Sequence, residues 1–144
     1  MLVQAERETR IARPPEMVFD FFADLRNEPQ WNHGHVLDVK MTSAPPIGLG
    51  TTFEGKHPGF GRATWRLVEY DRPRHLVIEG FAGKSPYRYV GDFESVGGAT
   101  VFRGRVEWEP RGIWRSLGPF LQPLLRFRAR RPFDNLRLAL EKEL

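Results

Sequence analysis

The chain has 144 residues, of which 40% are apolar and 28% are charged, proportions that are typical of a folded domain and exclude a disordered one. It contains no cysteine, which excludes disulfides and thiolate metal sites. No apolar run approaches the roughly 20 residues of a membrane span, and the N-terminus lacks the apolar core of a secretory signal. We therefore expect one cytoplasmic domain over residues 1–144.

The net charge of +4 is unevenly distributed. Residues 103–144 hold ten Lys and Arg against five Asp and Glu, which accounts for the whole excess. Between Arg111 and Arg131 there are six arginines and no acid. This segment is either a solvated helix face or a basic surface that contacts anionic membranes. No recognised nucleic-acid-binding module accompanies the charge, so we expect no nucleic-acid partner.

The first elements are a strand and two short helices. Residues 3–11 are predicted to form the strand. Pro14, Pro15 and Glu16 suit the start of a helix, because proline needs no N–H partner there and an acid complements the helix dipole. Apolar residues follow at helical spacing: Val18, Phe21, Phe22 and Leu25. Asn27-Glu28-Pro29 interrupts this helix, and a second short helix or turn ends near Trp31.

The pattern then changes to a period of two residues, which indicates β-strands. Glycine and proline punctuate the segments, as in an antiparallel meander. The predicted strands are residues 36–41, 51–56, 63–70, 76–81, 87–94 and 100–109. In the last strand, Phe102, Val106 and Trp108 share one face while Arg103, Arg105 and Glu107 share the other, so one face of the sheet is buried and the other is wet.

The C-terminal segment is predicted to be helical from Gly118-Pro119 onward. Its apolar stripe at helical spacing comprises Leu121, Leu125, Ala129, Phe133, Leu136 and Leu140. Pro123 and Pro132 lie inside it, so we expect kinks or two helices in series. A sheet with one apolar face and a single long helix packs best when the sheet curls around the helix. The expected fold class is therefore α+β, with about seven strands.

Several motifs resemble those of the SRPBCC superfamily, which has the helix-grip fold. They are the segment from Ile11 to Asp24, Asn27-Glu28-Pro29-Gln30-Trp31, Val68-Glu69-Tyr70-Asp71-Arg72-Pro73 and Gly97-Gly98-Ala99-Thr100-Val101. The superfamily includes START lipid-transfer domains, the birch-pollen-allergen family and polyketide cyclase/dehydrase-like proteins, and the last two motifs are similar to the cyclase/dehydrase-like branch. The resemblance covers essentially the whole chain and implies a cavity between sheet and C-terminal helix that accepts apolar ligands.

The expected ligand-binding residues follow from strand alternation and this resemblance. Aromatic linings with a few polar groups suit steroid-, lipid- or polyketide-like ligands. The candidates are Phe53, Trp65, Tyr87, Tyr89, Phe102, Trp108, Phe133 and Arg7. Arg7 has the parity of Thr9 and Ile11, which directs it inward, where an arginine needs a partner or an anionic group. The alternative is that the aromatic side chains only fill the core and that Arg7 is exposed to solvent.

Other polar motifs carry no clear chemistry. His33-Gly34-His35 could hold a metal, but zinc needs three or four ligands and no third is evident, so we predict no metal site. His57 lies at a turn and His75 at a strand start, where solvated side chains are expected. No nucleophile elbow, Walker A or dinucleotide motif occurs, so we expect no cofactor.

Three functions remain open. The first is binding of a hydrophobic small molecule without covalent chemistry. The second is a cyclase or dehydratase that folds a reactive chain in the cavity, with Tyr87, Tyr89, Arg7 and His57 as candidate acids and bases. The third is a peripheral membrane protein that contacts lipid through residues 111–131. The sequence is compatible with a monomer or a homodimer.

Overall fold

The computed structural model describes residues 2–32, 36–128 and 130–142, without the side chains of 113, 114, 128, 130–133 and 142. Its strands form one antiparallel sheet in the order β1-β7-β6-β5-β4-β3-β2. They are β1 (Val3–Ile11), β2 (Leu37–Met41), β3 (Thr52–His57), β4 (Gly61–Asp71), β5 (His75–Ala82), β6 (Ser85–Val96) and β7 (Ala99–Trp108). The predicted meander is confirmed, and β1 closes it by pairing with β7.

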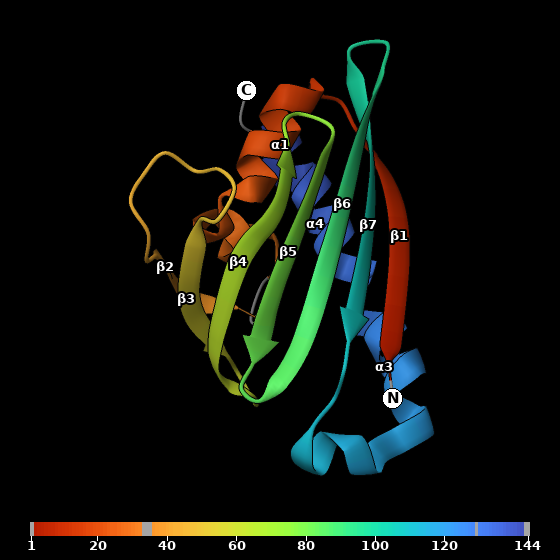
Figure 1. The fold of residues 1–144 in the computed structure, drawn as a ribbon. Coiled ribbons are helices and arrows are strands. Elements are labelled where there is room, and N and C mark those ends of the chain that lie inside the picture. The colour runs from red at the N-terminus through yellow and green to blue at the C-terminus, as the bar shows by residue number, and fades with distance from the viewer. Residues whose placement is uncertain (1, 33–35, 129, 143–144) are drawn as a thin grey trace.

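The helices lie on one side of the curved sheet (Figure 1). The chain forms α1 (Pro15–Ala23), the 3₁₀ turn η1 (Leu25–Asn27) and α2 (Glu28–Trp31) between β1 and β2. After β7 come the 3₁₀ segment η2 (Gly112–Phe120), α3 (Leu121–Arg128) and α4 (Arg130–Lys142). The C-terminal region is thus helical on both sides of residue 129, as its apolar stripe predicts, and α3 and α4 include Pro123 and Pro132. Together these elements make the helix-grip fold.

Alternation along the strands separates a dry face from a wet face. In β1, Val3, Ala5 and Ile11 are buried, whereas the intervening Gln4, Glu6, Glu8 and Arg10 are exposed. Charged side chains pair across the outer, convex face, where Arg103 contacts Glu8 at 2.8 Å and His75 contacts Asp92 at 2.7 Å. His75 is therefore half-buried and ion-paired, where a solvated side chain was expected. The concave face turns toward the helices.

The apolar interior is divided into two clusters of buried residues. The larger one joins the sheet to α1, α2 and α4, and includes Phe19, Phe22 and Leu136. The smaller one lies where α3 meets the other end of the sheet, and contains Val3, Trp108 and Leu121. α3 and α4 both pack against β1. Within the described residues, no helix is long and apolar enough to cross a bilayer.

Candidate functional site

Partly exposed side chains lie on the concave face between the two apolar clusters. They face the helices by strand parity, yet they are not fully covered: Arg7, Thr9, His57, Tyr87, Tyr89 and Val106. Four polar residues of this region, Glu28, His57, Tyr87 and Tyr89, are called the tyrosine cluster below. Polar groups on an otherwise apolar inner face are the feature that a ligand site requires.

Tyr87 and His57 meet across the sheet. Tyr87 lies on β6 and His57 at the end of β3, and the Tyr87 hydroxyl lies 3.4 Å from Nε2 of His57. The His57 ring also lies 5.7 Å from the Trp65 ring, centre to centre. Contrary to the expectation of a solvated turn residue, His57 is half-buried and faces inward, because β3 extends through it and it shares the parity of Phe53.

Tyr89 lies two residues further along β6, with its ring 5.3 Å from that of Phe22. The ring is partly exposed, but the hydroxyl oxygen is enclosed, and among the described residues it has no hydrogen-bond partner. A buried hydroxyl without a partner is unfavourable by roughly 1–3 kcal/mol. Such groups are rare in folded proteins and often mark a site that another molecule completes.

Glu28 is the residue of the cluster that the sequence analysis missed. It is the first residue of α2, and its carboxylate lies close enough to Tyr87 and Tyr89 to raise the pKa of both phenols. Burial raises the pKa of Glu28 itself from 4.5 to about 7, while a side-chain hydrogen bond with Asn32 limits the rise. A four-residue helix shows no periodicity, so no sequence pattern reveals which way Glu28 points.

Titration of the cluster follows from this burial. Removal from water, and secondly the charge of Glu28, raise the pKa of Tyr87 and of Tyr89 well above the usual 10. Both phenols therefore stay protonated near neutral pH and act as hydrogen-bond donors. Glu28, in contrast, exchanges its proton near neutral pH, which is the property of a general acid or base.

Two glycines allow the Trp65 indole to lie flat against the sheet beside the cluster. A Cβ at Gly55 would come within 3.1 Å of Trp65, and a Cβ at Gly80 within 3.1 Å of Trp65 and 3.3 Å of Tyr87. The side chains of Trp65 and Tyr87 therefore occupy space that any larger residue at position 80 would need.

The other predicted ligand residues divide by burial. Phe53 and Phe102 are 1% and 0% exposed and pack in the larger cluster. Phe102 can meet a ligand only if the core rearranges, whereas Phe53 also contributes to the depression on the convex face described below. Trp65 and Trp108 are also buried, and Trp108 packs edge-on against Phe60 at 5.5 Å. The Phe133 side chain lies outside the described residues.

Arg7 faces the helices from β1, as predicted, and is half-buried. Its neighbour on β7 is Gly104, which has no side chain to cover it. Tyr89 lies two strands across and two residues along from Arg7, which places their Cα atoms about 12 Å apart in the sheet. The inner face therefore has a cationic position at β1 and a phenol-rich position at β6.

The pair His33 and His35 lies outside the described residues. Within the described part of the chain, no group of three or more histidines and acids could hold a metal ion.

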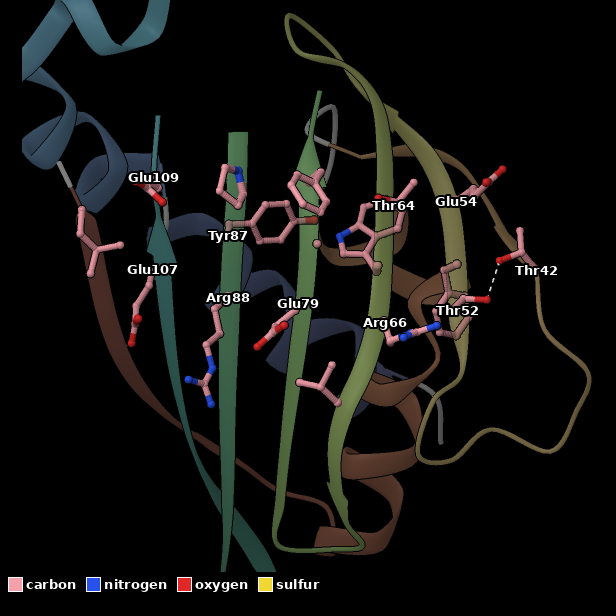
Figure 2. Close-up of a pocket in the computed structure, with 17 residues that line it drawn as sticks. Thr42, Thr52, Glu54, Thr64, Arg66, Glu79, Tyr87, Arg88, Glu107 and Glu109 are labelled. Carbon is pink, nitrogen blue, oxygen red and sulfur yellow. Dashed lines mark hydrogen bonds between the residues drawn. The ribbon is translucent and has the colours of Figure 1, made fainter. Parts of the chain in front are cut away.

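A depression of about 670 Å³ lies on the convex face (Figure 2), and Phe53, Trp65 and Tyr87 of the concave face also contribute to its lining. Glu107, Arg88, Glu79 and Arg66 follow one another across it on adjacent strands. Its lining also includes Glu54 and Glu109. Charged groups of alternating sign lie side by side here, where Arg88 also pairs with Glu69 and Glu107 with Arg105. Such a charged lining disfavours an apolar ligand, so we place the candidate site on the concave face.

Comparisons with known proteins agree with this geometry. The chain matches, over residues 3–141, the family described as polyketide cyclase / dehydrase and lipid transport. No curated protein matches. Of 291 similar solved chains, one is the crystal structure of Ara h 8.0201, with a TM-score of 0.71 and 12% identity. The match covers 99% of this chain and 100% of that one; at this identity it shows the fold alone, and the fold hosts many functions.

Proposed function

Because this chain belongs to the polyketide cyclase / dehydrase and lipid transport family, we propose that it binds an apolar small molecule against its concave face. The ligand lies between the two apolar clusters, and an oxygen atom of the ligand accepts a hydrogen bond from the tyrosine cluster. A lipid-, steroid- or polyketide-like molecule with a carbonyl group has this chemistry.

The observation that carries the proposal is the enclosed hydroxyl of Tyr89, which lacks a partner among the described residues. Its raised pKa keeps the proton on the oxygen, so the group needs an acceptor. A ligand carbonyl supplies that acceptor once a neighbouring side chain moves aside. The partly exposed Tyr89 and Tyr87 rings offer the apolar contact next to it.

A matched pair of probes tests the proposal. Acetylnaphthalene and ethylnaphthalene have similar shapes, but only the first carries a carbonyl acceptor. We expect Tyr89→Phe to weaken acetylnaphthalene binding by roughly five- to tenfold, the effect of one hydrogen bond, and to leave ethylnaphthalene binding unchanged. Equal affinity of both probes for the wild type and the variant would refute the proposal.

A second variant tests the location. Phe81 is 51% exposed and lines the convex depression. If the ligand binds the concave face, Phe81→Ser leaves the affinity for acetylnaphthalene intact. A loss of affinity in Phe81→Ser, with none in Tyr89→Phe, would move the site to the convex face.

The titration of Glu28 supports a second candidate function, an enzyme that cyclises or dehydrates a carbonyl compound. With a pKa of about 7, the Glu28 carboxylate can take a proton from the carbon next to a carbonyl group. The enolate oxygen then accepts hydrogen bonds from Tyr87 or Tyr89. The enolate carbon attacks a second carbonyl to close a ring, and the new alkoxide takes the proton back from Glu28.

Glu28→Gln separates the two functions. For a binding protein, the variant keeps its affinity for acetylnaphthalene and neither protein forms a product. For an enzyme, incubation of the wild type with a linear polyketone yields a cyclised product, detected by mass and absorbance, and Glu28→Gln loses that turnover while retaining affinity. If the wild type forms no product above the rate in buffer, the enzyme function fails and the binding function stands.

A further inference from the structure

The helix α3 is apolar on two sides, and only one side is covered. Leu121 is 1% exposed and packs with Val3 and Trp108, joined by the half-buried Leu125. A second set of apolar residues is exposed, from Leu117 before the turn at Gly118 into α3. It consists of Leu117, Phe120, Leu124 and Phe127, which are 44%, 75%, 42% and 71% exposed. This set is called the arm stripe.

A helix needs one apolar side to attach to its own fold. The first row already provides that attachment, so the arm stripe is surplus to folding. Two phenylalanines exposed by more than two thirds on one short segment are unusual for a surface that meets only water. The arm stripe therefore indicates contact with something apolar outside the described chain.

The charge around the arm stripe restricts what that contact can be. Residues 110–133 contain six arginines and no aspartate or glutamate. Arg115 and Arg126 lie within the same stretch as the stripe and are exposed. A row of aromatic and aliphatic side chains bordered by arginines matches the boundary of an anionic bilayer, where phosphates lie just above acyl chains.

The position of the segment suits such a contact. In Figure 1, η2 extends beyond the end of the sheet, and α3 leads back from it to pack beside the end of β1 near the N-terminus. Gly112 and Gly118 have φ values of 67° and 47°, which let the chain turn at two points of η2. Four apolar side chains are also far fewer than the roughly 20–30 residues that each partner contributes to a standard protein interface.

We propose that η2 and α3 dock this protein on an anionic lipid surface, with the arm stripe at the level of the acyl chains and the arginines at the phosphates. This goes beyond ligand binding on the concave face and does not depend on it. Because α3 also packs against the cluster around Trp108 and Leu121, docking brings the membrane next to one end of the concave face.

Vesicle sedimentation tests the proposal with the full chain. At low salt, the wild type should sediment with vesicles of phosphatidylcholine that contain about a third phosphatidylserine. Its partition coefficient on vesicles of pure phosphatidylcholine should be at least tenfold lower. Phe120→Ser/Phe127→Ser should lower the partition coefficient on anionic vesicles by about tenfold or more. Arg115→Gln/Arg126→Gln should lower the partition coefficient on anionic vesicles by a similar factor. High salt should abolish the difference between this variant and the wild type.

Two controls match these variants. Leu49 is 72% exposed on the loop between β2 and β3, so Leu49→Ser should sediment like the wild type. Arg66 is exposed on the convex face, so Arg66→Gln should do the same. All changed positions are exposed, and unchanged melting temperatures would show that the variants fold.

Three results would overturn the proposal. The first is equal sedimentation with anionic and neutral vesicles, and the second is wild-type behaviour of Phe120→Ser/Phe127→Ser. The third is a dimer in analytical ultracentrifugation that Phe120→Ser/Phe127→Ser converts to a monomer, which would make the arm stripe a subunit interface. Acetylnaphthalene binding should persist in Phe120→Ser/Phe127→Ser, so failure of docking and failure of ligand binding are separately visible.

Discussion

At the scale of single residues, the tyrosine cluster places polar groups where the fold alone would favour apolar ones. Tyr89 shows this directly, because its hydroxyl is enclosed and unpartnered among the described residues. We expect Tyr89→Phe to raise the free energy of unfolding of the ligand-free protein by about 1 kcal/mol, up to about 3 kcal/mol, since the unsatisfied group disappears while the ring stays. Urea unfolding measures it, and a destabilised variant would show that the hydroxyl is satisfied.

Glu28 makes stability depend on pH. Its folded pKa of about 7 lies above the ordinary 4.5, so between these values the folded protein holds a proton that the unfolded chain has released. Stability contributed by this group is therefore present below about pH 4.5 and is lost as the pH rises through 7. The loss amounts to roughly 3 kcal/mol at most.

Glu28→Gln removes this titration. Relative to the wild type, the variant should gain stability between about pH 5 and about pH 8, by up to roughly 3 kcal/mol. Urea unfolding of both proteins at the two pH values gives the difference. A gap between variant and wild type that does not change with pH would mean that Glu28 is ionised in the folded state throughout this range.

The same residues show what the sequence can and cannot predict about the site. Strand alternation correctly turns Tyr87, Tyr89 and Arg7 inward, because the period of two residues is long enough to read on β6 and β1. The inward orientation of His57 and the place of Glu28 in the site were not predicted, for a shared reason. His57 ends β3 beside a turn, and Glu28 begins the four-residue helix α2. At such positions, neighbours in space rather than in sequence decide how a side chain is oriented.

At the scale of secondary-structure elements, close approach between strands and rings explains the glycines of the sheet. A Cβ at Gly80 would overlap the Thr64 carbonyl oxygen and crowd Trp65 and Tyr87. Gly80→Ala should lower the free energy of unfolding by about 1–3 kcal/mol. Gly48→Ala is the matched control, because nothing lies within 4 Å of a Cβ there. Similar stability of both variants would show that β4 and β5 adjust freely around Trp65.

Element boundaries were predictable to different degrees. The seven strands follow from alternation and turn residues, with ends that differ by a few residues. The C-terminal region was harder, because two apolar rows overlap from Leu117 to Phe127. Their periodicity indicates helix but does not say which row attaches to the sheet. The structure resolves this by burying Leu121 and exposing Phe120.

At the scale of the whole molecule, the two clusters differ greatly in size. Leu136 belongs to the larger cluster and is 0% exposed, so Leu136→Ala should lower the free energy of global unfolding by about 2–5 kcal/mol. Among the side chains that the structure describes, Leu121 shares its cluster with two other buried residues, Val3 and Trp108. Leu121→Ala should therefore release α3 locally with a smaller global effect.

Hydrogen exchange and urea unfolding distinguish these outcomes. In Leu121→Ala, amides of α3 should exchange faster while those of β5 and β6 keep their protection. If Leu121→Ala instead lowered the global stability as much as Leu136→Ala does, α3 would be an integral part of the folding core. In that case, α3 could not detach locally from the rest of the fold.

The central claim, that an apolar ligand lies against the tyrosine cluster, is most directly tested by NMR of protein labelled with ¹³C in its three tyrosines. Tyr87 and Tyr89 belong to the cluster, whereas Tyr70 packs on Phe19 of α1, with ring centres 5.2 Å apart. We predict that titration with acetylnaphthalene shifts the ring signals of Tyr87 and Tyr89 and leaves Tyr70 unchanged. Saturable binding that leaves both cluster signals in place would contradict the account.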